Sequence, residues 1–314
     1  QVRYWKDRRN DCAHSKRNQV MSAHVEAFWA FMQSNLGRFV PNGSIADLLA
    51  RLERHFDPNQ TPPGQTLEPI VRTIPSCVPA VDLPKLMSDV QSQLSRTIGS
   101  RTIPRTMEQI SFYDAIFASG QQPSILALVN HLAGQPEFFA AFTRSHPERL
   151  PFFATNASLV RELWRKYLFA GGVGELSLFA ALLRNNLVPA GQIKEACERA
   201  VAGLNGDIPT AVDIPDLLRA GWVEEFRVQA FGSAKKVDEF AWGNRNAAVI
   251  QWFLMYEQIS PDVAKVLCAT FGSTPYPNTV RDTLRDFFAS DSTKKTEFIA
   301  AAAAAGATPP PSLI

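Results

Sequence analysis

Long apolar runs are missing from this chain of 314 residues. No stretch approaches the roughly 18 consecutive apolar residues that would span a bilayer, and residues 1–6 lack the apolar core of a signal peptide. Cysteine is scarce as well. Cys12, Cys77, Cys197 and Cys268 stand far apart without a CxxC pair, which argues against a zinc site and a disulfide framework. We therefore expect a soluble, cytoplasmic protein with no membrane association, no metal and no cofactor.

A surplus of one charge sign is missing too. The 32 Lys and Arg residues against 30 Asp and Glu give a net charge of +2, which excludes a whole-chain polyelectrolyte such as a histone or an acidic tail. Any contact with nucleic acid must therefore be local. Apolar residues, at 46% of the chain, suffice for a sizeable core, and the length allows two domains or one elongated domain.

Apolar residues recur at helical spacing along most of the sequence. The pattern predicts an amphipathic helix over 18–39, and Ser44 is expected to cap a second helix that ends at Phe56. Prolines restrict residues 67–81 to short helical turns. Strand patterns are nearly absent, apart from an ambiguous run over 225–231. Further helices are predicted over 83–98, 106–119, 124–133, 136–143, 158–169, 175–185, 190–204, 215–231, 244–256, 261–271, 278–288 and 293–304.

These patterns predict an all-α chain, in which the end of a helical bundle is followed by an array of antiparallel helix pairs, a degenerate α-solenoid. A compact bundle is less favoured at this length. We expect the end of a helical domain over 1–66, a Pro-rich connector over 67–81, a helical-repeat-like domain over 82–305 and a tail over 306–314. The abrupt start in charged and aromatic residues indicates a fragment of a longer protein.

Positive charge is concentrated near the start of the chain. Six of the fifteen residues over 3–17 are Lys or Arg and two are Asp, a local charge of +4, with Tyr4 and Trp5 among them. Cations that meet phosphates, interleaved with rings that stack on bases, are typical of a nucleic-acid contact. A solvated helix face would have the same charge pattern. The candidate RNA-binding residues are Arg3, Lys6, Arg8, Lys16 and Arg17.

Arg9, Asn10 and His14 are the candidate catalytic residues. Metal-independent RNA cleavage needs a base for the 2′-hydroxyl, an acid for the departing 5′-oxygen and a permanent cation for the phosphate. Histidine can act as the base or the acid, and arginine keeps its charge. Five positions along a helix turn by about 140°, so Arg9 and His14 do not stack. They could border one groove, especially with a second copy of the chain.

Arg9-Asn10-Asp11-Cys12-Ala13-His14 resembles the R-(N, D or H)-x-x-x-H signature of the HEPN superfamily. Trp5 and the following amphipathic helix also look like the last helices of this family. The resemblance covers residues 1–40. It implies a helical bundle that dimerises to form a composite, metal-independent ribonuclease site, in toxin or phage-defence proteins. It also implies that Arg9 polarises the scissile phosphate, that His14 transfers a proton and that Asn10 orients the pair.

Other candidate sites are weaker. Residues 171–174, Gly-Gly-Val-Gly, match no phosphate-binding signature and are expected to form a turn between helices. The remaining histidines have no partners at metal-binding spacing and are expected at the surface or at boundaries. Pairs such as Phe138-Phe139 and Phe287-Phe288 are expected in the core.

Two functions remain open from the sequence. The first is the C-terminal part of a HEPN-type endoribonuclease with a helical regulatory or recognition domain. Its partners would be RNA, a second copy or a larger assembly, and a regulatory protein or phage trigger. The second is a non-catalytic helical sensor or scaffold module of a larger defence or signalling protein, in which the motif over 9–14 is structural.

Overall fold

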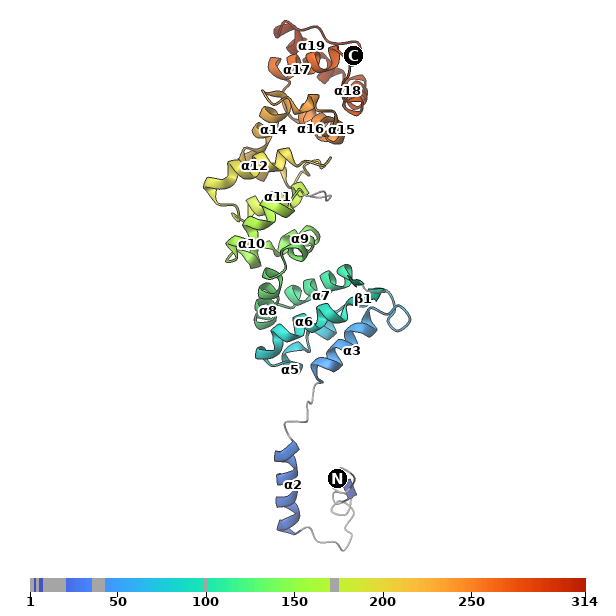
Figure 1. The fold of residues 1–314 in the computed structure, drawn as a ribbon, viewed down its shortest axis with the longest axis vertical. Helices are drawn as coiled ribbons and strands as arrows, with labels where there is room; N and C mark the ends of the chain where they lie inside the picture. Colours follow the sequence, from blue (N-terminus) through green and yellow to red (C-terminus); the bar gives the residue numbers. More distant parts are fainter. Residues whose placement is uncertain (1–2, 4–5, 8–20, 36–42, 99–100, 170–174) are drawn as a thin grey trace. The chain divides into compact units, whose positions relative to one another are not determined.

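The computed structural model describes residues 3, 6–7, 21–35, 43–98, 101–169 and 175–314. Within these ranges the regular elements are helices, apart from one two-stranded hairpin (Figure 1). The predicted all-α class is therefore confirmed. The chain divides into two compact units, Gln1–Ala127 and Leu128–Ile314.

Short and medium-length helices make up the first unit. In chain order its elements are α2 (Ser22–Asn35), α3 (Ile45–His55), α4 (Glu68–Val71), α5 (Ile74–Cys77), the 3₁₀ turn η2 (Ala80–Asp82), α6 (Leu83–Gln93), β1 (Ser95–Ile98), β2 (Arg101–Pro104), α7 (Thr106–Ser119) and the start of α8 (Gln122–Ala133).

The core of the first unit lies where α3 packs against α6 and α4 packs against α7. Ser44 begins α3 as predicted, because its side chain accepts a hydrogen bond from the Asp47 N–H at 3.3 Å. Residues 67–81 hold only short helical turns, as their prolines predict, and they contribute to this core. Their buried apolar residues are Leu67, Ile70, Val71, Ile74, Cys77 and Val78.

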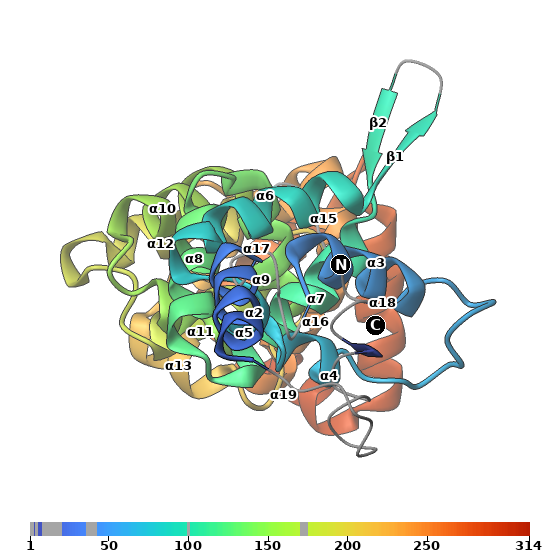
Figure 2. The ribbon, with the colours of Figure 1, turned by 90° about the horizontal axis from the view of Figure 1, so that it is seen from below.

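The predicted helix over 83–98 is wrong at its C-terminal end. Helix α6 ends at Gln93, and the side chain of buried Gln109 donates to the Leu94 carbonyl at 2.8 Å. Strands β1 and β2 follow, antiparallel, with Thr97 opposite Thr102 (Figure 2). Two Thr-Ile pairs around Gly99-Ser100 are the sequence signal for a hairpin. The helical spacing of Ile98 obscured that signal.

Helices continue through the second unit. Its elements are α9 (Pro136–Ser145), η3 (Pro147–Phe153), α10 (Ala157–Glu162), the π-helical turn η4 (Leu163–Tyr167), α11 (Glu175–Arg184), η5 (Ala190–Gln192), α12 (Ile193–Ala202), α13 (Ile214–Ala220), α14 (Trp222–Phe231), η6 (Lys236–Asp238), α15 (Phe240–Arg245), α16 (Ala247–Tyr256), α17 (Pro261–Gly272), α18 (Asn278–Ser290) and α19 (Ser292–Ala304).

Many helices of the second unit pack against the helix two positions further along the chain. Helix α9 contacts α11, α11 contacts α13, α12 contacts α14, α16 contacts α18, and α17 contacts α19 (Figure 1). In this pattern each helix pair shares an apolar face with the next pair, as in stacked helical arrays. The predicted array of helix pairs is confirmed.

Two predicted helices of this unit are each divided in the structure. The helix over 215–231 consists of α13 and α14, separated by Gly221 at φ +81°. Glycine reaches this left-handed backbone region without the steric cost that a Cβ adds. The ambiguous run over 225–231 is part of helix α14. The predicted helix over 158–169 changes from α-helical to π-helical geometry at Leu163.

Aromatic side chains and one buried amide fix the middle of the second unit. The Phe226 ring lies 5.6 Å from Trp222 and 5.3 Å from Phe253, measured between centroids. Nearby, the fully buried Asn246 accepts from the Gly206 N–H at 2.9 Å and donates to the Leu204 carbonyl at 3.2 Å. These bonds hold the loop after α12 against the start of α16.

Candidate functional site

The predicted catalytic residues Arg9, Asn10 and His14 lie outside the described residues, as do Arg8, Lys16 and Arg17. Of the predicted RNA-binding residues, Arg3 and Lys6 are described, and both are helical and exposed. The predicted catalytic arrangement therefore lies outside the described part of the chain. Residues 171–174 likewise lie outside the described ranges.

Helix α2 follows the Arg9–His14 segment in the sequence and exposes apolar side chains. Met21, just before the helix, is 63% exposed, Val25 is 48% exposed and Trp29 is 61% exposed. Their spacing of four residues places them along one face of the helix. His24 has a local role, because its Nδ1 accepts from the Met21 N–H at 3.2 Å. An exposed apolar face on a regular helix is typical of a surface that packs against another element.

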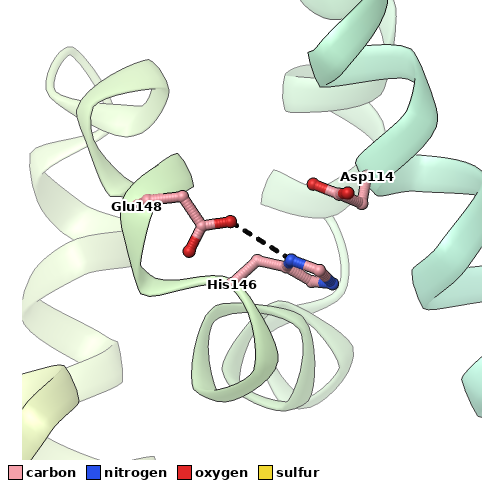
Figure 3. Close-up of side chains that lie close together, drawn as sticks. All are labelled: Asp114, His146 and Glu148. Carbon is pink, nitrogen blue, oxygen red and sulfur yellow. Dashed lines mark hydrogen bonds and ion pairs between the residues drawn. The ribbon is translucent and has the colours of Figure 1, made fainter.

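The other histidines of the described ranges contact side chains next to them in the sequence. His146 Nδ1 lies 3.2 Å from Glu148 Oε1 (Figure 3). Asp114, also labelled there, belongs to α7 of the first unit. His131 Nε2 lies 2.9 Å from Gln135 Nε2, and His55 lies edge-on to the Phe56 ring. Burial lowers the pKa of both His131 and His55, so each favours the neutral form.

Two of the cysteines in the described part of the chain are poorly suited to thiol chemistry. Cys77, Cys197 and Cys268 are all buried. Burial, with smaller contributions from Glu225 and Glu198, raises the pKa of Cys197 to about 12. Burial also raises the pKa of Cys268. Since the thiolate is the nucleophilic form, neither Cys197 nor Cys268 is activated for covalent catalysis.

Buried carboxylates of the second unit join helices rather than form a reactive pair. Asp213 Oδ2 accepts from Ser177 Oγ at 2.7 Å and from Thr210 Oγ1 at 2.6 Å. Asp216 Oδ2 accepts from Arg184 Nε at 2.7 Å. Both carboxylates are buried. Their contacts hold α13 against α11, which is a structural task.

A cavity of about 320 Å³ in the first unit was not visible in the sequence. Its wall comes from the turns around α5 and η2, the first residue of α6 and the start of α8. These segments meet only in the folded chain. The lining residues are Pro75, Val78, Ala80, Leu83, Gln121, Pro123 and Ser124.

Among the described helices, none combines the length and apolar character needed to cross a membrane. Comparisons of the chain with protein-family models, with curated proteins and with solved structures found no match.

Proposed function

We propose that the chain contributes half of a metal-independent endoribonuclease site of the HEPN type. Arg9, Asn10 and His14 are the catalytic residues, and two copies of the motif face each other. The observation that carries the proposal is the Arg-Asn-x-x-x-His sequence within a segment of local charge +4. The helical array recognises the RNA, a regulatory protein or a phage-derived trigger.

The chemistry follows from the residue types. A histidine of the composite site takes the proton of the 2′-hydroxyl, whose oxygen attacks the neighbouring phosphorus. The bond to the 5′-oxygen breaks, that oxygen receives a proton from an acid of the site, and a 2′,3′-cyclic phosphate remains. Arg9 stabilises the negative charge that builds up on the phosphate in the transition state. Lys16 and Arg17, close in sequence, would bind flanking phosphates.

Two observations on the described residues support this proposal. The histidines there make contacts close to them in the sequence, and burial raises the pKa of the Cys197 and Cys268 thiols. The two thiols therefore do not compete with the Arg9–His14 segment as a catalytic centre. In addition, the apolar face of α2 formed by Met21, Val25 and Trp29 suits a helix that packs in a bundle or against a second copy.

The test is cleavage of a 5′-labelled RNA of randomised sequence by the full chain. We expect products ending in a 2′,3′-cyclic phosphate, and no cleavage of the same RNA carrying 2′-O-methyl groups. Arg9→Ala and His14→Ala should each reduce the rate at least 100-fold, because proton transfer and charge stabilisation each contribute on the order of 10²–10³.

His24→Ala is the matched control, since His24 lies ten residues beyond His14 and its Nδ1 accepts from the Met21 N–H. It should leave the rate unchanged. Circular dichroism checks that every variant remains folded. Cleavage by Arg9→Ala and His14→Ala at the rate of the unaltered chain would refute the proposal. A folded chain that cleaves no RNA would instead support the non-catalytic sensor or scaffold function.

A further inference from the structure

The chain turns back on the second unit after α19. Gly306, at φ +67°, donates its N–H to the Ala303 carbonyl at 3.0 Å, and the Ala307 N–H donates to the Ala302 carbonyl at 2.9 Å. This pair of bonds is a Schellman motif, which ends a helix and redirects the chain. Residues 308–314, which we call the strap, then lie beside α19 (Figure 1).

Two side chains of the strap are buried, although the strap is not part of a helix. Leu313 is fully buried, and Pro310 is buried as well. Thr308, Pro311 and Ile314 are exposed. Such an alternation shows that one side of the strap packs against other parts of the unit. Burial of a leucine side chain is one of the larger favourable contributions that a single residue makes.

Two hydrogen bonds locate the surface that holds the strap. Ser312 Oγ donates to the carbonyl of Phe271, in the last turn of α17, at 3.1 Å. Lys295 Nζ, in the first turn of α19, donates to the Ile314 carbonyl at 3.2 Å. We call the surface bordered by Phe271 and Lys295 the strap seat.

The strap presents a compact turn to this seat. The Leu313 N–H donates to the Pro310 carbonyl at 3.0 Å, which closes a four-residue turn over 310–313. Pro311 stands at the second position of the turn, where proline sets the backbone angle in advance. A turn that is formed before it binds loses little conformational freedom on binding.

Few bonds hold the strap in place. Among the described residues, the two hydrogen bonds to Phe271 and from Lys295 are the only ones that join 308–314 to a helix. The prolines over 309–311 have no N–H that could add another. Segments with so few backbone bonds open locally at a lower free energy than the whole fold. The strap can therefore leave its seat while α17 and α19 stay folded.

We propose that the strap seat is a binding site for a Pro-x-x-Leu turn of another protein, and that the strap is its displaceable resident. The partner's proline and leucine take the places of Pro310 and Leu313. A serine before that leucine donates to the Phe271 carbonyl. The tethered strap competes at a high effective concentration, so the seat is closed to weak ligands. This site does not involve Arg9 or His14 and is independent of the ribonuclease proposal.

A fluorescein-labelled peptide of residues 307–314 tests the seat by fluorescence anisotropy with the full chain. Leu313→Asp in the chain should open the seat, because a buried carboxylate is costly. Thr308→Asp places the same charge at an exposed strap residue and is the matched control. We expect Leu313→Asp to bind the peptide at least about tenfold more tightly than the unaltered chain or Thr308→Asp, because the apparent affinity follows the fraction of open seats.

Altered peptides define what the seat recognises. The peptide with Leu313→Asp should not bind to the opened chain. The peptide with Ser312→Ala should bind about fivefold more weakly, the factor that one net hydrogen bond gives. Circular dichroism checks that each chain variant is folded. If Leu313→Asp unfolds, Leu313→Ala gives the same comparison without a buried charge.

Hydrogen exchange of the unaltered chain tests whether the strap opens by itself. We expect the Leu313 amide to exchange at least about 100-fold faster than that of Leu267 in the middle of α17. Equal exchange rates would overturn the proposal, since the strap would then be a fixed part of the fold. It is also overturned if the folded, opened chain does not bind the peptide. Dimers of the unaltered chain that excess peptide dissociates would assign the seat to the strap of a second copy instead.

Discussion

Arg184 Nε donates to Asp216 Oδ2 at 2.7 Å and thereby links the last residue of α11 to α13. The Asp216 side chain is only 8% exposed, while the Arg184 side chain is 41% exposed. The same guanidinium also donates to the Val212 carbonyl at 3.1 Å. An arginine from the neighbouring helix thus bonds a mostly buried carboxylate, which Arg219 of α13 also bonds at 3.1 Å.

We expect Arg184→Ala to lower the free energy of unfolding by about 1–3 kcal/mol, because it removes a charged donor from a buried acceptor. Arg227→Ala is a matched control. The Arg227 side chain is 40% exposed, but its partner Glu224 is 61% exposed, so its loss should cost about 0.5 kcal/mol or less. Urea denaturation measures both values. Equal losses would show that burial of the carboxylate has no role.

Gly221 separates α13 from α14 at φ +81°, with open space where a Cβ would lie. We expect Gly221→Ala to destabilise the protein by roughly 1–2 kcal/mol through backbone strain alone. Gly272, the last residue of α17, has equally open space but no positive φ. Gly272→Ala should be neutral or stabilising by up to about 1 kcal/mol. Thermal unfolding of both variants checks this, and a loss at Gly272 matching that at Gly221 would contradict it.

His131 should make stability depend on pH. Burial lowers its pKa in the folded chain, so the unfolded chain binds the proton more readily. As pH falls below about 6.5, protonation therefore favours unfolding, and this effect continues until the pH passes the folded pKa. We expect the melting temperature of the unaltered chain to fall relative to that of His131→Gln as the pH is lowered from 7.5 to 5. A melting-temperature difference between the two proteins that stays constant over this range would contradict the prediction.

Metal removal should leave the proposed ribonuclease activity intact. The proposed chemistry uses only the side chains of Arg9, Asn10 and His14, which need no divalent cation. We expect cleavage of the randomised RNA to continue at the same rate in excess EDTA. Restoration of a lost activity by Mg²⁺ or Mn²⁺ would point to a different mechanism and would contradict the roles assigned to these residues.

The sequence predicted helices well where one apolar stripe repeats between clear end signals. Ser44 and the stripe over 45–55 located α3 correctly, and 106–119 matches α7 residue for residue. It failed where two patterns compete over a few residues. Ile98 continues a helical spacing and also fits the alternation of a strand. The end of α6 is set by a distant residue, because the Gln109 side chain on α7 donates to the Leu94 carbonyl. No local pattern contains that contact.

The candidate sites also differ in whether the sequence alone can identify them. The Arg9–His14 motif is contiguous, so the sequence alone could identify it, and its roles remain predictions. The cavity beside Gln121 could not be identified from the sequence, because its lining combines residues 75–83 with residues 121–124.

The sequence by itself determined the helical class, the short proline-rich turns and the local concentration of positive charge, since each follows from residue types at short spacing. Tertiary structure decided where helices stop, which carboxylates are paired and where a cavity forms. The physical reason is that helix propensity and charge act over a few residues. Burial and hydrogen-bond satisfaction depend on segments that folding brings together, as it brings Arg184 to Asp216 and Gln109 to Leu94.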